Sequence, residues 1–318
     1  ALLFRHYRLS YIVPGERFPR RRKSEDQDER DLTAVAYRDT LGQGFTRIGD
    51  IFSRELNPDR KKPFDMRQVM RAIVDQDGEI LERWRSLQDG DTSLVWETRL
   101  GGEAVGMIGI ESRNFPRIGS VPPDGPDTWS GGTLYPNSSR KVARGLNAFS
   151  GRLPAVIVAN LSGFDGSPES MRKRQLEFGA EIGRAIVNFD GPIVFCVVSR
   201  YHGGAYVVFS KRLNPNLEVA ALEGSFASVI GGAPAAAVVF PKEVRQRTEG
   251  DERIVSGRER LKRGKMERKE FEQLYQAVYN EHQTALGAEF DGIHSVERAR
   301  EVGSIDTIIA PGKIRPYL

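Results

Sequence analysis

The residues with the clearest chemical meaning are three small ones in a row, Gly203-Gly204-Ala205. Because they have almost no side chain, a substrate oxygen can approach their backbone N–H groups closely. If a helix begins there, its first N–H groups have no partner within the helix and favour negative charge. The turn therefore suits the binding of an enolate or ureido oxyanion. The simpler alternative is a tight turn in which glycine only meets the dihedral needs of the backbone.

A second turn of this kind comes earlier in the chain. The apolar run Pro154 to Ala159 predicts a buried strand that stops at Asn160-Leu161-Ser162-Gly163. A helix is expected from about Pro168 to Phe189, with Ser167 or Asp165 as its N-cap. The expected apolar side of that helix consists of Leu176, Phe178, Ala180, Ile182, Ala185, Ile186 and Phe189.

The two turns belong to one crossover unit. Another buried strand, Ile193 to Ser199, follows the helix and breaks at Arg200-Tyr201-His202, just before the first turn. This order of elements, a strand and a turn followed by a helix and then a second strand and turn, places both turns at the same end of a parallel sheet. Ligands bind at that end in open parallel sheets, so the pattern predicts a shared site.

The remaining periodicity indicates an α/β protein. Helices are expected over residues 63–75, 138–149 and 246–269, strands over 94–100, 104–111, 217–222 and 305–310, and a surface loop over 112–132. Asn137 or Ser138 is the expected cap of the second helix, whose polar face carries Lys141 and Arg144, either solvated or bound to a ligand phosphate. Gly231-Gly232-Ala233 repeats the small-residue turn. A helical face that should pack on the core consists of Phe271, Leu274, Tyr275, Val278 and Tyr279.

Composition excludes several classes of protein. The 318 residues are 39% hydrophobic and 28% charged, which is typical of a soluble globular protein, and no run is long enough to span a membrane. The single cysteine, Cys196, permits no intrachain disulfide and favours a cytoplasmic location. Four scattered histidines show no metal-ligand spacing. Acidic residues follow the basic run Arg20-Arg21-Arg22-Lys23 directly, so a solvated linker is expected there and no nucleic-acid site.

The chain also resembles a known family, the carboxyltransferase domain of biotin-dependent acyl-CoA carboxylases, and in particular its C-terminal, biotin-side half. The resemblance extends over roughly residues 60 to 318 and depends on several segments in family order. These segments are Phe64-Asp65-Met66-Arg67, Ile73-Val74-Asp75, Leu81-Glu82, residues 100–109, residues 136–144, Pro154 to Gly166, Gly203-Gly204-Ala205, residues 305–311 and Arg315.

The resemblance implies a crotonase-like spiral of ββα units over residues 61–318, after the tail of a preceding subdomain and a charged linker at 1–60. It implies transfer of a carboxyl group from carboxybiotin to the alpha carbon of an acyl-CoA, acetyl-CoA or longer. Gly204 and Ala205 would donate to the ureido oxygen of biotin, and Gly163 and Phe164 would form the neighbouring wall. The other residues implied at the biotin site are Tyr201, His202, Gly203, Gly166, Gly232, Ala233 and Arg200.

Two departures from the family pattern matter. His202 stands where some relatives have an arginine that holds the carboxylate, so a protonated His202, or Arg200, would have to take that role. Only the biotin-side half is present, and the chain does not begin with Met, so a fragment or split subunit with little activity alone is expected. The implied partners are an acyl-CoA-side half, a biotin carboxyl carrier to which the biotin is attached, a biotin carboxylase and further copies of this chain.

Two other functions remain open. A self-sufficient crotonase-type hydratase or isomerase would need a carboxylate over the acyl pocket, for which Glu223 and Asp165 are the nearby candidates. A structural or assembly subunit would keep the fold without chemistry, and a bulky substitution at Gly204 would then leave the activity of the complex intact.

Overall fold

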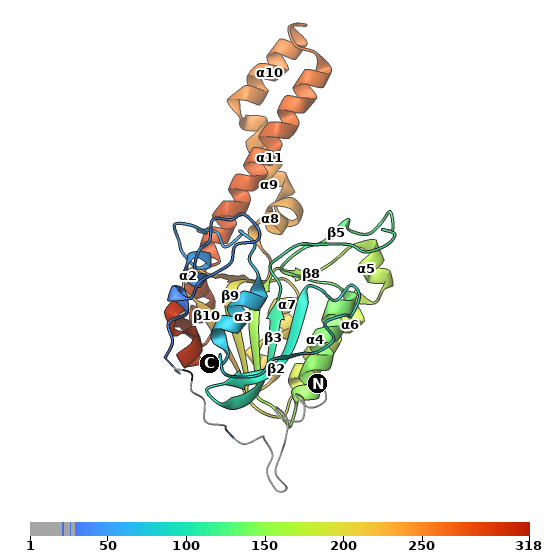
Figure 1. Cartoon of the computed structure of the whole chain (residues 1–318). Helices are drawn as coiled ribbons and strands as arrows, with labels where there is room; N and C mark the ends of the chain where they lie inside the picture. Colours follow the sequence, from blue (N-terminus) through green and yellow to red (C-terminus); the bar gives the residue numbers. More distant parts are fainter. Residues whose placement is uncertain (1–20, 22–25, 27–28) are drawn as a thin grey trace. The chain divides into compact units, whose positions relative to one another are not determined.

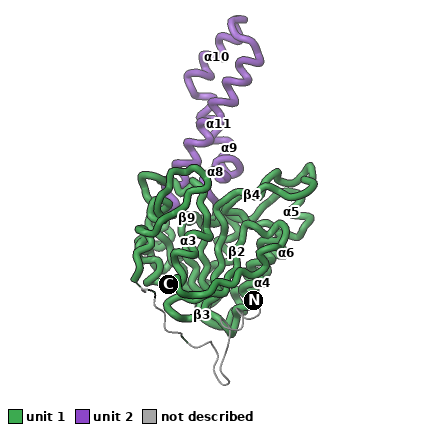
Figure 2. Tube along the Cα trace, in the orientation of Figure 1, with its two compact units in different colours: residues 1–229, 296–318 green, residues 230–295 purple. Residues whose placement is uncertain are grey.

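The computed structural model describes residues 21, 26 and 29–318. The chain divides into two compact units (Figure 2). Residues 1–229 and 296–318 form the first, called the sheet unit below, and residues 230–295 form the second, called the hairpin unit. The expected N-terminal tail, residues 1–15, and residues 20, 22 and 23 of the basic run lie outside the described residues.

An eight-stranded mixed sheet forms the centre of the sheet unit, in the order β1-β2-β3-β7-β9-β10-β12, with β11 beside β9. Strands β1, β2 and β3 are antiparallel to one another, whereas β3, β7, β9, β10 and β12 are parallel, as is β11 to β9. The α/β class is therefore confirmed. The strands are β1 (Leu81–Glu82), β2 (Ser93–Leu100), β3 (Glu103–Ile110), β7 (Ala155–Leu161), β9 (Ile193–His202), β10 (Leu217–Leu222), β11 (Phe226–Ser228) and β12 (Thr307–Ile309).

Helices and two small sheets complete the sheet unit. Strand β4 (Phe115–Pro116) pairs with β5 (Thr128–Trp129) within the expected loop, and β6 (Thr133–Leu134) pairs with β8 (Gly163–Phe164). The α-helices are α2 (Ile48–Ile51), α3 (Met66–Ile73), α4 (Pro136–Phe149), α5 (Pro168–Arg172), α6 (Gln175–Val187), α7 (Ala205–Val208), α12 (Val296–Glu301) and α13 (Ile314–Tyr317).

The sheet is covered on both faces because its central strands are apolar on both sides. Helices α4 and α6 lie side by side against one face (Figure 1), where Leu146, Ile186 and Phe195 belong to one buried core. On the other face α3 and residues 32–52 form a second core, in which Met70 packs with Val198. Alternate residues of β9 thus enter different cores, as the pleat of a strand requires.

The crossover between the two turns differs from its prediction in two ways. The helix expected from Pro168 to Phe189 is two helices, α5 and α6, because Arg174 adopts a left-handed conformation with φ of 66°. Ser167 caps α5 as expected, and Ile182 and Ile186 are buried, but Leu176 is 72% exposed. Strand β9 continues to His202, three residues beyond its predicted end, because β11 pairs with residues 200 to 202.

The two strands before the loop, β2 and β3, agree with their predicted ranges to within one residue, whereas α4 differs from its prediction. Gly101 and Gly102 join β2 to β3 with φ of 57° and 83°, the positive values that a primed turn needs. Helix α4 begins at Pro136 with Tyr135 as its cap, so the expected caps Asn137 and Ser138 are wrong. Lys141 is also not on a polar face, since it is only 2% exposed.

Lys141 instead anchors α4 to the segment before β2. Its Nζ donates to the carbonyl oxygens of Gly90 at 3.2 Å and Ser93 at 2.7 Å. Desolvation lowers the pKa of Lys141 to about 8. Both expectations for Lys141, solvation and phosphate binding, are therefore wrong, because its buried ammonium group is held by backbone carbonyl oxygens. Arg144 is exposed and its guanidinium lies 4.7 Å from the ring centroid of Trp84.

The hairpin unit is helical throughout. Its elements are α8 (Gly232–Pro234), a π-helical turn (Ala235–Val239), α9 (Pro241–Gly250), α10 (Glu252–Lys262) and α11 (Arg268–Ile293). The apolar face of residues 271–279 was expected on the core of the sheet. It packs within the hairpin unit instead, where the Phe271 ring and Leu274 approach Gly257 of α10, so that expectation is wrong.

Candidate active site

The first turn follows β9 without an intervening loop. Gly203 has φ of 69°, which favours glycine, and its N–H donates to the carbonyl oxygen of Val229 at 2.9 Å, just after β11. Gly204 then caps the short helix α7, and its carbonyl accepts from the N–H groups of Val207 and Val208 at 3.1 Å. A helix thus does begin at this turn, although it has only four residues.

The N–H groups of Gly204 and Ala205 are left for a ligand. Within the described part of the chain, neither group has a hydrogen-bond acceptor. Gly204 is exposed, whereas Ala205 is 0% exposed, so its N–H group lies below the surface of the turn. Two adjacent N–H groups without an acceptor can stabilise developing negative charge on one oxygen.

The second turn lies directly against the first. Gly163 has φ of 136°, and β8, which it begins, pairs in parallel with β6. A Cβ added to Gly203 would lie 3.3 Å from Cα of Gly163, and one added to Gly204 would lie 2.7 Å from Cδ2 of Phe164. The prediction that both turns meet at one end of the sheet is therefore confirmed, and the Phe164 ring forms the wall beside Gly204.

The three residues before the first turn enter the sheet instead of lining an open pocket. Tyr201 is 1% exposed, its ring centroid lies 4.8 Å from that of Phe195, and burial raises its pKa. His202 is 2% exposed, with Nδ1 3.1 Å from Oγ of Ser228. Arg200 donates from Nη2 to the carbonyl oxygen of Asp59 at 3.0 Å. Their side chains are thus held by the strand and its neighbours.

The other candidate residues lie in different surroundings. Gly166 is exposed, with no atom within 4 Å of an added Cβ. Gly232 and Ala233 belong to the hairpin unit, where the Gly232 N–H donates to Oδ1 of Asp291 at 2.7 Å. The structure thus brings together Gly163, Phe164, Gly203, Gly204 and Ala205 as one cluster, called the turn cluster below.

The two candidate carboxylates of the hydratase alternative are not arranged over the turn cluster as free bases. Asp165 Oδ2 accepts from the N–H of Ser167 at 3.3 Å and from its hydroxyl group. Glu223 is exposed at the end of β10, and its backbone N–H donates to the Ile309 carbonyl at 3.0 Å.

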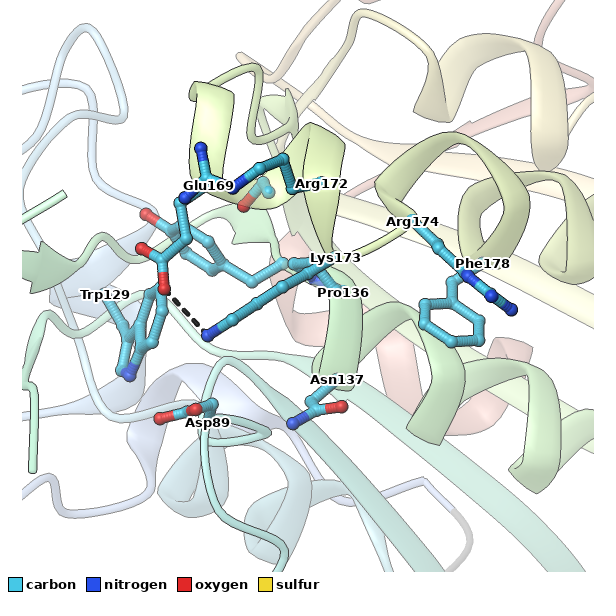
Figure 3. A pocket seen from close by; sticks show the side chains of 11 residues that line it. Asp89, Trp129, Pro136, Asn137, Glu169, Arg172, Lys173, Arg174 and Phe178 are labelled. Carbon is cyan, nitrogen blue, oxygen red and sulfur yellow. Dashed lines mark hydrogen bonds and ion pairs between the residues drawn. The ribbon is translucent and has the colours of Figure 1, made fainter. Parts of the chain in front are cut away.

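A pocket of about 350 Å³ borders α5, the helix after the second turn (Figure 3). Trp129 and Phe178 supply its aromatic surface, and Arg172, Lys173 and Arg174 its positive charge. These residues were not identified from the sequence. The basic triplet at the junction of α5 and α6 could have indicated this pocket, but such a triplet is also typical of a solvated helix end.

Glu169 fixes the position of α5 beside this pocket. Its Oε1 and Oε2 accept from Arg117 at 2.9 and 2.6 Å, and Oε1 also accepts from Lys173 at 2.7 Å. The Arg117 guanidinium lies 4.2 Å from the ring centroid of Trp129. Hydrogen bonds from Arg117 first, and from Lys173, lower the pKa of the buried Glu169 to about 2.

Other chemistry is limited within the described residues. Burial raises the pKa of Cys196 to about 12, so its thiol is not a nucleophile at neutral pH. No group of three or more His, Cys, Asp or Glu in the described ranges could hold a metal ion. None of the helices formed by the described residues is long and apolar enough to cross a membrane.

The chain is similar in sequence to several known proteins. One stretch of 163 residues is 30% identical to the acetyl-CoA carboxylase of Schizosaccharomyces pombe and covers 48% of this chain and 7% of that protein. Another of 132 residues is 33% identical to the mitochondrial acetyl-CoA carboxylase of Saccharomyces cerevisiae and covers 38% and 6%. In Dictyostelium discoideum, acetyl-CoA carboxylase is 29% identical over 178 residues, covering 52% and 8%. The chain thus matches less than a tenth of the length of these relatives.

The fold has a solved counterpart in transcarboxylase 12S, a hexamer described with methylmalonyl-CoA bound. The two structures superpose with a TM-score of 0.54 at 21% sequence identity, over 81% of this chain and 40% of that chain. At this identity the likeness shows the fold alone, and it confirms the crotonase-like fold expected from the sequence. A family model for the carboxyl transferase domain matches residues 22–318, and this chain therefore belongs to the carboxyl transferase domain family.

Proposed function

We propose that this chain supplies the biotin-side half of a carboxyltransferase site, which moves a carboxyl group from carboxybiotin to the alpha carbon of an acyl-CoA. The observation that carries the proposal is the turn cluster. Two N–H groups, those of Gly204 and Ala205, lack an acceptor in the described part of the chain and lie beside the Phe164 ring. Membership of the carboxyl transferase family supports the same chemistry.

The turn cluster fits a flat ring that carries one carbonyl oxygen. A side chain at position 204 would fill the space next to Phe164, since even a Cβ would lie 2.7 Å from the ring. Glycine at 203 likewise allows the two turns to lie close together, since an added Cβ would lie 3.3 Å from Cα of Gly163. Carboxybiotin, when bound, supplies the carboxyl group that is transferred.

The residues of this chain would act by position and not by proton transfer. The Gly204 and Ala205 N–H groups would donate to the ureido oxygen and stabilise the charge that it gains as the carboxyl group leaves. Phe164 would exclude water from one side of the ring and so strengthen those hydrogen bonds. Asp165 would contribute no base, since its carboxylate accepts from Ser167.

The proposal includes partners that the turn cluster cannot replace. The acyl-CoA would be held by an acyl-CoA-side half, on the same polypeptide or another subunit. Biotin would arrive on a carrier protein after carboxylation by a biotin carboxylase, and a homo-oligomer would complete the assembly. Matches of 6% to 8% of the carboxylase relatives are consistent with one part of such a system.

The reverse reaction tests the proposal most simply. The purified chain would be incubated with malonyl-CoA or methylmalonyl-CoA and free biocytin, with and without the acyl-CoA-side half, and decarboxylation of the CoA ester would be followed. We expect turnover that depends on biocytin and requires the added half. A folded and assembled pair without biocytin-dependent turnover would contradict the proposal and favour a structural subunit. Hydration of an enoyl-CoA by the chain alone would favour the hydratase alternative instead.

A further inference from the structure

Basic residues are dense around the turn between α10 and α11. Residues 258–270, called the hairpin tip below, contain seven Lys and Arg residues and three Glu residues. These 13 residues therefore have a formal net charge of +4.

Most of these charges are free to meet a partner. Arg260 and Arg263 lie near Glu270 and Glu259, at 4.0 and 3.6 Å, and Arg268 lies 3.0 Å from Glu272. The remaining four cations have no carboxylate within 4.0 Å among the described residues, and all four are exposed. They are Arg258, Lys262, Lys265 and Lys269.

The stem of the same hairpin is built differently. Arg247 of α9 pairs with Glu243 and with Glu289 of α11, each at 2.7 Å. Arg253 of α10 pairs with Asp251 at 3.0 Å and with Glu281 of α11 at 2.7 Å. The two pairs to α11 hold the helices together, whereas the four unpaired cations of the hairpin tip contact no carboxylate in the part of the chain that the structure describes.

The backbone of the hairpin tip is held in a closed turn, so the Cα atoms of its charged residues have a fixed pattern. The turn between α10 and α11 is closed by bonds from the Lys265 N–H to the Arg260 carbonyl at 2.8 Å and from Gly264 to Leu261 at 3.1 Å. Gly264 has φ of 66°, and Met266 is 9% exposed beneath the turn. A fixed pattern of charge loses less entropy on binding than a flexible basic tail does.

We propose that the hairpin tip is an electrostatic docking site for an acidic protein surface; if the proposed function is correct, that surface belongs to the protein that carries biotin. Three glutamates among the seven cations suit a folded protein, which can place its own cations opposite them. A nucleic acid has only negative charge along its backbone and would be repelled by each glutamate. The hairpin tip also has no aromatic residue on which bases could stack.

Docking of this kind accelerates encounter and leaves the chemical step unchanged. The effect therefore applies to biotin attached to its carrier and not to free biocytin. A loss of charge at the hairpin tip should raise the KM for the biotinylated carrier without a change in kcat. High salt should have the same consequence, because it screens exposed charges.

The test compares two variants with the same net charge in the full chain, assembled with its acyl-CoA-side half. K262E/K265E reverses two charges of the hairpin tip, and K242E/R245E reverses two exposed charges of α9 that have no ion-pair partner among the described residues. We expect the tip variant to raise the KM for the biotinylated carrier about tenfold at low ionic strength, and the α9 variant to raise it less than about twofold. Both variants should keep the wild-type kcat with free biocytin, and the difference should vanish near 0.5 M salt.

Direct titration of the biotinylated carrier against each variant separates this proposal from the proposed function. Weaker binding by the tip variant alone would support the docking site even if no turnover with biocytin were found. Equal changes in the two variants, or none, would overturn the docking site while biocytin turnover left the proposed function standing. Tight, salt-sensitive binding of a short DNA duplex or of anionic vesicles, without binding of the carrier, would also overturn it.

Discussion

The same tripeptide, Gly-Gly-Ala, occurs twice in this protein and performs two different tasks. In Gly203-Gly204-Ala205 of the sheet unit, the second and third N–H groups have no acceptor in the described part of the chain. In Gly231-Gly232-Ala233 of the hairpin unit, the second N–H donates to Oδ1 of Asp291 at 2.7 Å. Gly203-Gly204-Ala205 leaves two donors without an acceptor among the described residues, whereas Gly231-Gly232-Ala233 uses a donor to fasten α8 to α11.

The need for glycine differs in the same way. A Cβ at Gly204 would meet the Phe164 ring at 2.7 Å, which is a side chain beside the proposed ligand. A Cβ at Gly232 would meet the backbone carbonyl oxygen of Gly287 at 1.9 Å, within a packed helix contact. One glycine therefore keeps a binding surface open and the other allows close packing. The difference is set by residues far away in the chain, 40 positions before Gly204 and 55 to 59 positions after Gly232.

The largest effect is expected from Gly204→Val. Its γ-methyl groups would displace the Phe164 ring and cover the Gly204 and Ala205 N–H groups. Loss of a preorganised oxyanion donor typically lowers kcat by a factor of about 10² to 10³. We expect such a loss in the biocytin-dependent decarboxylation assay, with secondary structure and assembly unchanged because Gly204 is exposed.

Gly166→Ala is the matched control for that variant. Gly166 is exposed near the second turn and has no atom within 4 Å of an added Cβ, so its kcat should stay within about twofold of the wild type. Full activity of Gly204→Val in the complete complex would show that the free N–H groups of Gly203-Gly204-Ala205 do not act in catalysis. The structural-subunit alternative would then be favoured.

The next largest effect is expected at Glu169, which holds α5 in place beside the turn cluster. Glu169 lies in the first turn of α5, the helix after Gly163-Phe164, and hydrogen bonds from Arg117 and Lys173 lower its pKa from 4.5 to about 2. This difference between folded and unfolded states corresponds to a stabilisation of about 3 kcal/mol at neutral pH. Glu169→Gln should therefore lower the free energy of unfolding by about 3 kcal/mol at pH 7, measured by denaturant titration.

The pH dependence of this effect has a definite sign. Because the folded-state pKa is lowered, the stabilisation is complete above about pH 4.5 and is lost as the pH falls toward 2. The difference between the wild type and Glu169→Gln should shrink over that window. Glu177→Gln, at an exposed and unpaired position of α6 among the described residues, should change stability by less than about 0.5 kcal/mol at any of these pH values. An equal loss in both variants would show that the buried pair has no special role.

Local patterns in the sequence predicted the parts that local forces decide. The apolar runs of β7, β9 and β10 and the positive-φ glycines between them follow from periodicity and turn chemistry, and they were sufficient to bring Gly163 and Gly203 together. Burial of Lys141 and the pairing of Glu169 with Arg117 were missed. Their partners lie 48 to 52 residues away, and no pattern of the sequence links them. The second Gly-Gly-Ala turn looked like the first for the same reason, since only Asp291 distinguishes it.

The smallest effect on activity is expected at Gly231-Gly232-Ala233 of the hairpin unit. Gly232→Ala would place a Cβ 1.9 Å from the Gly287 carbonyl oxygen and 2.7 Å from Oδ1 of Asp291, so α8 and α11 must separate. Overpacking of this kind costs about 1–3 kcal/mol, which hydrogen exchange in residues 241–293 would detect as faster opening of the hairpin unit. Gly292→Ala, with no atom within 4 Å of its Cβ, should leave exchange unchanged or slower. We expect kcat with free biocytin to fall less than about threefold in Gly232→Ala. A loss as large as that of Gly204→Val, without faster exchange, would show that both turns bind the ligand.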